Sequence, residues 1–461
     1  MEGQLVSPML QTARGGSVGP ATSRRRVALV SLVILGWVAV GWAEDTPKAP
    51  PGARQLADTP FQLVLPSEHL LGDWFGARTW LEEHGVTPTV TFVTDALGNP
   101  TGGMRQGFRG ASNLGLDLLF DIEKIFGLGG ASFEISFSAR SGSSLSKEDI
   151  GNVFSVQQDF GGETYRLVDV AYRQQLLGDR VEFRVGRIAA GDDFLVSPYN
   201  YVFVQNGFDG NPVGVFFNAP GMTAYPNATW GGLAKVRPTE RTYVIGGLYN
   251  GDPSIRDNNH HGADWSMAGP LFAMAEVGFQ VNGRPGDRGL LGNYKAGFWY
   301  DDSQYTDFNT VARGLAPQVS RGNWGFYGLF DQVLVPFGGP GSNRGFGVTG
   351  SVLVSPDRSV SQMPLFSTAG FLARGIFPSR PTDVGGVGVV YGHFSDDLQD
   401  AQRRAGVGVQ RYEIALELTY RFRFRGDAVF FQPDLQYIIR PGGTGQIADA
   451  FVAGFQAGIN F

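Results

Sequence analysis

The feature that most constrains this chain is an alternation of apolar and polar side chains with a period of two, which recurs from residue 86 to the C-terminus. In residues 132–138 the aromatic and aliphatic side chains take one face of an extended strand, and serine and glutamate take the other. Residues 412–422 repeat the pattern with a polar face of glutamate, threonine and arginine. A soluble β-sandwich could produce such strands. So could a membrane barrel whose apolar face meets lipid and whose polar face lines a water-filled lumen.

The lengths of the connections favour the barrel. Short connections such as 178–179 and 424–426 alternate with long ones such as 98–112 and 189–227. Short turns on one side and long loops on the other are typical of outer-membrane barrels. We therefore predict an all-β fold, a 16-stranded antiparallel transmembrane β-barrel over residues 87–461, preceded by a short N-terminal helix. The expected strands span 87–97, 113–122, 131–140, 163–177, 180–188, 228–237, 241–249, 270–281, 288–301, 321–334, 343–354, 365–374, 382–394, 410–423, 427–439 and 449–461.

The N-terminal region carries the marks of an export signal. Three arginines at 24–26 precede an apolar run at 27–40, and small residues follow at the cleavage positions. This pattern predicts a signal peptide over 1–43, cleaved after about Ala43. The alternative is an uncleaved anchor helix, which the short run disfavours. The next segment, 44–69, is rich in proline and is expected to be a flexible leader.

One helix is expected before the barrel, in the segment 70–86. Asp73 can cap it, an apolar stripe follows, and Gly85 ends it after about three turns. We expect this helix either to lie on the periplasmic side or to plug the mouth of the barrel.

The last eleven residues, 451–461, alternate up to a terminal phenylalanine, Phe461. A soluble protein rarely ends on such a strand, because termini fray. A barrel needs its last strand paired with its first, since closure removes the exposed edge. A terminal phenylalanine resembles the signal that the outer-membrane assembly machinery of Gram-negative bacteria recognises, so that machinery is a predicted partner.

Composition excludes several classes of protein. The chain has no cysteine and only 5 histidines, so disulfides, cysteine-ligated metals and a cysteine nucleophile are ruled out. The net charge of −6 provides no basic surface for nucleic acid. The many glycines include no phosphate-binding loop. We expect no enzyme activity, no cofactor and no metal site.

Three stretches resemble the OprB-type carbohydrate-selective porins. The first is Leu-Gly-Asp-Trp-Phe-Gly-Ala-Arg at 71–78, followed by Gly-Asn-Pro-Thr-Gly-Gly at 98–103. The second is Arg-Val-Gly-Arg-Ile-Ala-Ala-Gly-Asp-Asp-Phe at 184–194, and the third is Asn-Ala-Pro-Gly-Met-Thr-Ala-Tyr-Pro at 218–226. The resemblance covers about residues 70–461. It implies a sixteen-stranded barrel in the cell outer membrane that passes sugars by diffusion.

The long segment 189–227 is the best candidate for a loop folded into the lumen, where it would narrow the pore. In the strand before it, Glu182 and Arg184 fall on the polar face and are expected to line the lumen. Arg187 falls on the lipid-facing parity, but Gly186 permits a bulge that would turn it inward. We predict that Arg187 forms part of the constriction wall. The alternative is that it sits at the interface or caps carbonyl groups of the loop.

Further candidates come from the loop itself and from neighbouring strands. Asp192 and Asp193 open the loop and would set an acidic face against a basic wall. Alternatively, these carboxylates hold backbone N–H groups at turns, which is also the simpler explanation for Asp209. Parity places Asp169 and Arg173 on the lumen side of 163–177, and Glu134 and Arg140 on that of 131–140. The aromatic side chains that could stack on a sugar, or instead belong to the lipid-facing girdles, are Tyr199, Tyr201, Phe208 and Trp230.

These observations predict an outer-membrane porin for passive, carbohydrate-selective diffusion of small sugars such as monosaccharides. The alternatives are a general diffusion porin without sugar preference and a secreted, soluble, β-rich carbohydrate-binding protein. The expected partners are small sugars, outer-membrane lipid and lipopolysaccharide, and the assembly machinery, with a homo-oligomer left open.

Overall fold

The computed structural model describes residues 68–461, apart from 253, 255, 256, 264, 283–288, 338–343 and 427. The expected signal peptide with its cleavage site, and the leader up to residue 67, lie outside the described residues.

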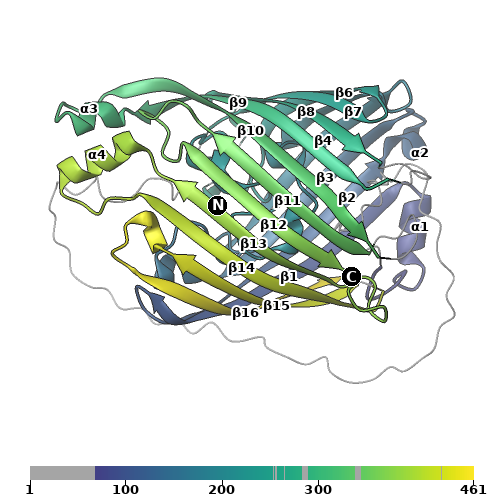
Figure 1. Ribbon diagram of the computed structural model, residues 1–461. Coiled ribbons are helices and arrows are strands. Elements are labelled where there is room, and N and C mark those ends of the chain that lie inside the picture. Colours follow the sequence, from purple (N-terminus) through teal and green to yellow (C-terminus); the bar gives the residue numbers. More distant parts are fainter. Residues whose placement is uncertain are drawn as a thin grey trace, which may run out of the picture. The chain divides into compact units, whose positions relative to one another are not determined.

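Over the described residues, sixteen strands form a closed antiparallel barrel, in which each strand pairs with the next and β16 pairs with β1 (Figure 1). The seam is closed by a continuous ladder from Thr91↔Asn460 to Gly98↔Ala453. The predicted fold is confirmed. The strands are β1 (Val86–Gly103), β2 (Phe108–Asp121), β3 (Ala131–Gly142), β4 (Thr164–Leu176), β5 (Val181–Ile188), β6 (Thr229–Thr239), β7 (Thr242–Asn250), β8 (Leu271–Val281), β9 (Gly292–Thr306), β10 (Val319–Pro336), β11 (Gly345–Val354), β12 (Leu365–Arg374), β13 (Val384–His393), β14 (Tyr412–Phe424), β15 (Val429–Ile439) and β16 (Ala448–Asn460).

One expected long connection is wrong. Residues 98–112 belong mostly to strands, and only 104–107 separate β1 from β2. The Gly-Asn-Pro-Thr-Gly-Gly stretch looks like a loop in sequence, but it stays paired with β16 through two register shifts. The Asn99 amide holds the turn by donating to the carbonyl oxygens of Gly102 (2.9 Å) and Arg105 (2.8 Å).

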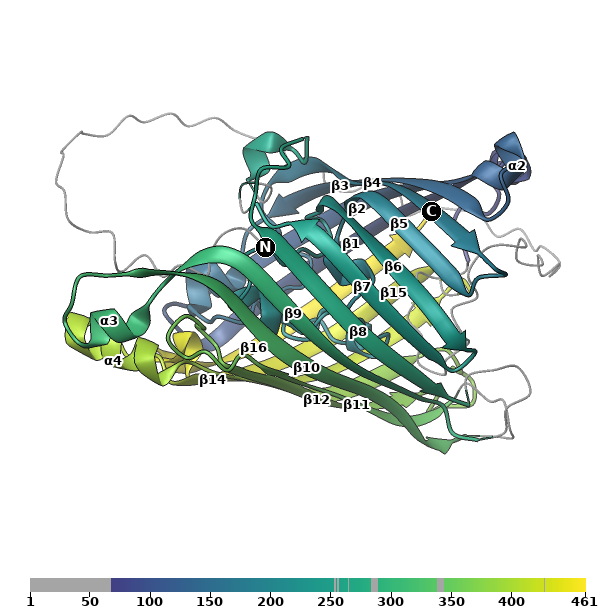
Figure 2. The same ribbon diagram turned by 90° about the horizontal axis from the view of Figure 1, so that it is seen from above.

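Helices lie at both ends of the barrel (Figure 2). At the end with the short turns are α1 (Ala77–Glu83) and α2 (Ile122–Phe126), and at the other end are α3 (Phe308–Ala312) and α4 (Asp396–Ala405). Short 3-10 and π turns are η2 (Ser146–Ile150), η3 (Ala190–Asp192), η4 (Asn200–Val202), η5 (Val213–Phe217), η7 (Asn258–His260) and η8 (Pro441–Gly443).

The N-terminal helix is shorter than expected, and Asp73 does not cap it. The helix starts only at Ala77, its N-cap is Gly76, and no side chain caps it. Residues 70–76 form turns instead, because Gly72, Trp74, Phe75 and Gly76 all have positive φ.

No helix within the described residues combines the length and the hydropathy that a membrane-spanning helix needs.

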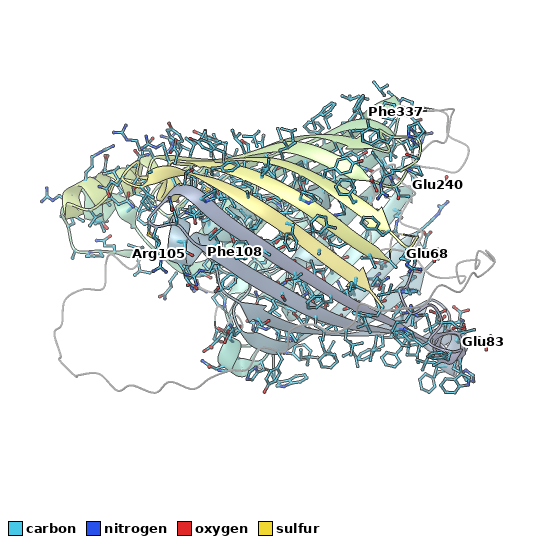
Figure 3. All side chains as sticks on the ribbon, turned by 90° about the horizontal axis from the view of Figure 1, so that it is seen from below. Glu68, Glu83, Arg105, Phe108, Glu240 and Phe337 are labelled. Carbon is cyan, nitrogen blue, oxygen red and sulfur yellow. The ribbon has the colours of Figure 1, made fainter. Side chains whose placement is uncertain are left out.

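The two faces of the barrel wall follow the predicted alternation. In β5, Phe183 and Val185 are 45% and 55% exposed, whereas Glu182 and Arg184 are 0% and 2% exposed. Figure 3 draws the described side chains on the ribbon, seen from below. The apolar face therefore meets lipid and the polar face meets the lumen.

Candidate functional site

Two long connections fold into the lumen and contact each other. We name residues 189–228, between β5 and β6, the inner loop, and residues 143–163, between β3 and β4, the companion loop. The backbone N–H of Gln158 donates to the carbonyl of Val204 (3.0 Å), and that of Asn206 donates to the carbonyl of Ser155 (2.8 Å). The inner loop is packed like a core, with Phe194, Val204 and Phe208 all fully buried.

Carboxylates on one side of the barrel hold the backbone of these loops. We call this side, from β8 to β15, the far wall. Glu417 on β14 accepts from the N–H groups of Val204 (2.7 Å) and Gln205 (3.0 Å). Glu276 on β8 accepts from the N–H of Leu195 (2.8 Å). Asp301 on β9 accepts in the same way from the N–H of Gly221. Glu413 on β14 accepts from the N–H groups of Val153 and Phe154 in the companion loop. These carboxyl groups accept from backbone N–H groups that the loop would otherwise bury without a partner, so these acids act as clamps.

Donor side chains on the far wall complete the attachment. Lys295 donates to the carbonyl of Val196 (2.6 Å), and Arg421 and Gln432 donate to those of Tyr201 (3.0 Å) and Val202 (2.7 Å). The wall thus satisfies buried N–H and C=O groups that a loop inside a barrel would otherwise leave unpaired.

Glycines on β12 and β13 make room for the rings of the inner loop. Phe203 and Phe208 stack with ring centroids 4.0 Å apart. A Cβ added at Gly388 would lie 2.7 Å from both rings. Phe208, a predicted sugar contact, is therefore a packing residue in this structure, and Tyr199 is likewise fully buried.

The opposite side of the barrel, β1 to β5, also carries a clamp, because Asp95 on β1 accepts from the N–H of Asp159 (3.0 Å), but it adds a cluster of charged side chains. We call this side the near wall. Arg184 on β5 lies among four carboxylates: Asp193 at 2.8 Å, Glu134 at 3.2 Å, Asp192 at 3.5 Å and Asp169 at 3.7 Å. The structure brings five of the residues predicted from the sequence together here: Arg184, Asp169, Asp192, Asp193 and Glu134. The side chains of Glu134 and Asp192 are each 31% exposed, so this cluster meets the lumen water.

The sign of this cluster differs from the expected basic wall. One guanidinium faces four carboxylates, and two of these, Glu134 and Asp169, belong to the wall itself. We call it the acidic station.

A second polar cluster lies farther along β3, around Arg140. Its guanidinium carbon sits 5.4 Å from the ring centroid of Tyr225 in the inner loop. The charge of Arg140 also acts on Asp159 of the companion loop and on Asp209. Burial raises the pKa of Asp159 to about 6, although Arg140 opposes this shift, and burial raises the pKa of Asp209 as well. We call this cluster the arginine station.

The two stations are joined by polar side chains on one face of β3. Glu134, Ser136, Ser138 and Arg140 alternate along the lumen face, so the stations are about 20 Å apart at 3.3 Å per residue. Ser138 donates to the amide oxygen of Asn113 on β2 (2.7 Å). The near wall is therefore a continuous polar track.

The remaining predicted residues lie outside this track. Arg187 is 1% exposed, and its Nε donates to the carbonyl of Val168 (3.1 Å). Gly186 has φ 143°, where a Cβ would lie 2.2 Å from the carbonyl oxygen of Val170. The β4–β5 and β5–β6 registers run through Gly186 without a shift, so the predicted bulge is wrong, although Arg187 is buried and bonded to β4.

Glu182 is fully buried and accepts from Gln175 (3.1 Å), and Arg173 pairs with Arg184 in the β4–β5 register. Among the aromatic residues, Tyr201 is 38% exposed. The ring of Trp230 lies 5.1 Å from that of Trp265, which is 59% exposed.

Sequence reasoning missed Asp159, Tyr225 and the clamping role of the far-wall acids. Only the length of the connection 141–162 could have indicated that the companion loop folds inward. Glu417 and Glu134 both alternate with apolar residues and both fall on the lumen face of their strands. The local sequence therefore does not distinguish a clamp from a pore-lining acid.

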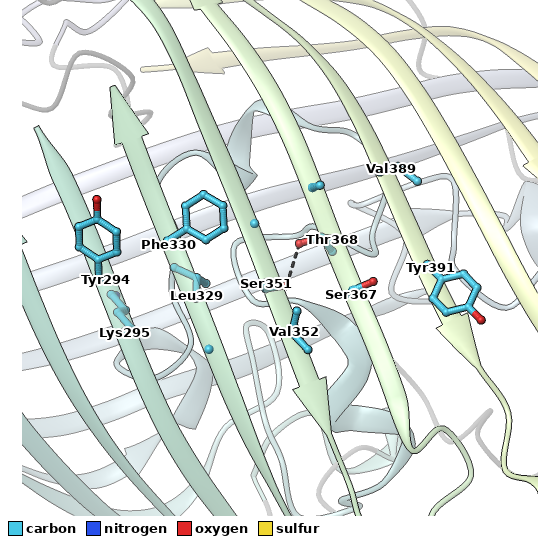
Figure 4. A pocket seen from close by; sticks show the side chains of 13 residues that line it. Tyr294, Lys295, Leu329, Phe330, Ser351, Val352, Ser367, Thr368, Val389 and Tyr391 are labelled. Atoms are coloured by element: carbon cyan, nitrogen blue, oxygen red, sulfur yellow. Dashed lines mark hydrogen bonds between the residues drawn. The ribbon is translucent and has the colours of Figure 1, made fainter. Parts of the chain in front are cut away.

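A hollow of about 560 Å³ on the outer wall between β9 and β13 is not part of this track (Figure 4). Its rim includes the exposed Tyr294, Phe330 and Val352, which face lipid. Ser351 and Thr368 hydrogen-bond to each other (2.7 Å), and both are buried on the lumen-facing side of their strands.

A closed sixteen-stranded barrel with an apolar outer face and loops packed into a polar lumen defines an outer-membrane porin. The chain belongs to the OprB family of carbohydrate-selective porins, whose family profile matches residues 105–461. It is an outer-membrane sugar porin, as the sequence predicted.

Individual relatives agree with this assignment. Porin B of Pseudomonas aeruginosa is 29% identical over 421 residues, which cover 85% of this chain and 90% of the relative. A putative porin, QuiX, of Acinetobacter baylyi is 25% identical over 421 residues, covering 85% and 93%. The high-pH structure of Pseudomonas putida OprB superimposes with a TM-score of 0.80 at 26% identity, covering 86% of this chain and 99% of that one.

Proposed function

We propose that monosaccharide-sized neutral sugars cross this porin between the inner loop and the near wall, passing the acidic station and the arginine station in turn. The observation that carries the proposal is the contrast between the walls. The far-wall acids are bonded to loop backbone, whereas Glu134 and Asp192 remain open to water.

The stations supply what a passing sugar needs. Carboxylates accept from hydroxyl groups, the Arg140 guanidinium donates to them, and the rings of Tyr201 and Tyr225 offer apolar faces. These groups replace part of the sugar's hydration shell, while spreading the contacts over two stations keeps each binding step weak enough for release. Passage needs no covalent step and no cofactor.

Liposome swelling tests the proposal. Purified protein is reconstituted and compared in isosmotic glucose, sucrose, gluconate and an uncharged polyol of glucose size. We expect glucose to enter faster than the polyol, and gluconate to be slowed by the acidic station. Equal rates for glucose, gluconate and the polyol would contradict the proposal and favour a general diffusion pore.

We also infer that the assembly machinery recognises the C-terminal strand before β16 pairs with β1. In the closed barrel the backbone groups of Phe461 already have partners within the chain. Its N–H donates to the carbonyl of Val90 (2.9 Å), and its own oxygen accepts from Arg78 (2.6 Å). Phe461→Ala should reduce the fraction of protein that shifts on gels upon heating. An unchanged folded fraction in cells would contradict this inference.

A further inference from the structure

Large apolar side chains are exposed together at the end of the barrel that carries the short turns. We call them the rim patch: Leu71, Phe75 and Trp80 from the N-terminal segment, and Phe126 and Leu128 beside α2. Phe75 is fully exposed, and Phe126 is 78% exposed. Figure 3 shows aromatic rings gathered beside Glu83, which lies in α1. Soluble surfaces rarely carry such a concentration of bare rings.

The backbone is held in an unusual conformation to present this patch. Trp74 and Phe75 are consecutive and both left-handed, with φ 55° and 59°, which bulky residues rarely adopt. Contacts to the last strand fix this turn. Arg78 lies 4.6 Å from the Trp74 ring centroid and donates to the oxygen of Phe461 (2.6 Å), and the N–H of Leu70 donates to the carbonyl of Asn460 (2.8 Å). Strain maintained in this way points to a role for what it exposes.

The two helical parts of the patch are fastened to each other. Lys124 on α2 donates to the carbonyl of Glu82 on α1 (3.0 Å), and the N–H of Asp121 donates to the carbonyl of Gly85 (2.7 Å). The patch is therefore a rigid extension of the barrel rim.

A groove continues the patch onto the lipid-facing wall. It has a volume of about 530 Å³ and is lined by His84, Val86, Phe120, Ile122, Ile125, Phe126, Phe133 and Ile135. Phe133 and Ile135 alternate with the lumen-facing Glu134, so they belong to the lipid face of β3. The rim patch is thus continuous with a surface that the bilayer already covers.

We propose that the rim patch is a lipid-binding surface, which inserts into the periplasmic leaflet of the outer membrane and takes a phospholipid acyl chain into the groove. Short turns mark the periplasmic side of outer-membrane barrels, which places the patch at that leaflet. Aromatic rings at this depth sit favourably at the headgroup boundary. The inference concerns the bilayer and goes beyond the passage of sugar.

The absence of cysteine from the chain makes a direct test simple. Phe75→Cys and Phe126→Cys, each in the full barrel, are labelled with an environment-sensitive fluorophore and reconstituted into phosphatidylethanolamine–phosphatidylglycerol vesicles containing lipid with a nitroxide near the headgroup. Glu240→Cys, in the exposed β6–β7 turn at the same end, is the matched control. The heat-induced shift on gels verifies that each barrel is folded.

We expect the nitroxide lipid to quench both patch probes several-fold more than the Glu240 probe, and aqueous iodide to quench them less. Using two positions guards against relaxation of the strained turn in the Phe75 variant. Quenching equal to that of the control would overturn the proposal. Protection of the patch probes from iodide that disappears when the barrels are diluted in excess lipid would also overturn the proposal. The rim patch would then be covered by a second copy of the chain and not by lipid.

Discussion

The near and far walls of this barrel carry the same kinds of side chain on the same parity, yet they do different work. On the far wall, Glu417 and Glu276 accept from loop N–H groups and are almost fully buried. On the near wall, Glu134 pairs with Arg184 and remains 31% exposed to the lumen. The difference lies in which wall the inner loop covers. Whether a carboxylate on the lumen face is buried as a clamp or left open to the lumen therefore depends on its tertiary partner.

The largest effect is expected from removing a far-wall clamp. Glu417→Ala leaves the N–H groups of Val204 and Gln205 without their acceptor, at a cost of about 1–3 kcal/mol for each unsatisfied group. The inner loop should detach locally, and sucrose should enter liposomes faster. Glu417→Gln keeps an acceptor and should change the sucrose rate less. If both variants exclude sucrose like the unaltered protein, the clamp account fails.

A strong effect on charge selectivity is expected from the near wall. Arg184→Gln removes a guanidinium that lies within 4 Å of four carboxylates, so cation selectivity in planar bilayers should rise several-fold and glucose flux should fall. Arg237→Gln removes an equal charge from a half-buried position near the β6–β7 turn and is the control. Equal reversal potentials for the two variants would show that the acidic station does not line the pore.

A smaller effect is expected from filling the space beneath the rings of the inner loop. Gly388→Ala places a Cβ 2.7 Å from Phe203 and Phe208, and overpacking of this kind costs about 1–3 kcal/mol. The midpoint of urea unfolding, followed by tryptophan fluorescence, should fall. Gly129→Ala, where a Cβ would meet nothing within 4 Å, should leave it unchanged. Equal midpoints would mean that the far wall is not packed as described.

The smallest effect is a dependence on pH through Asp159, whose pKa burial raises to about 6. The pKa of Asp159 in the folded state lies above the ordinary aspartate value of 3.8. The folded state therefore binds more protons between these two values, and its stability falls as the pH rises through this window. Lowering the pH from 7 to 5 neutralises Asp159 beside Arg140, so cation selectivity should decrease. Asp159→Asn should flatten this part of the pH profile. If cation selectivity in that variant still changes fully between pH 7 and pH 5, the pH dependence belongs to another titratable group.

The barrel itself could be predicted, because alternation is a local property that each strand displays and because the terminal strand ends on Phe461. The bulge predicted at Gly186 was wrong, because this glycine takes a positive φ without shifting the register of either neighbouring strand. The extent of β1 could not be predicted, because Gly98 to Gly103 resemble a loop until β16 is placed beside them. The division of the acids could not be predicted either. Glu134 and Glu417 differ only in whether the inner loop, distant in sequence, lies over them.

Cysteine accessibility measures this division most directly. Glu134→Cys on the near wall and Thr419→Cys on the far wall, each the sole cysteine, are treated with a water-soluble thiol reagent in proteoliposomes while glucose swelling is followed. The account predicts rapid modification of the Glu134→Cys variant with loss of glucose flux, and little modification of the Thr419→Cys variant, whose native side chain is 2% exposed. Equal reaction at both positions, or reaction at position 134 without any effect on glucose flux, would contradict it.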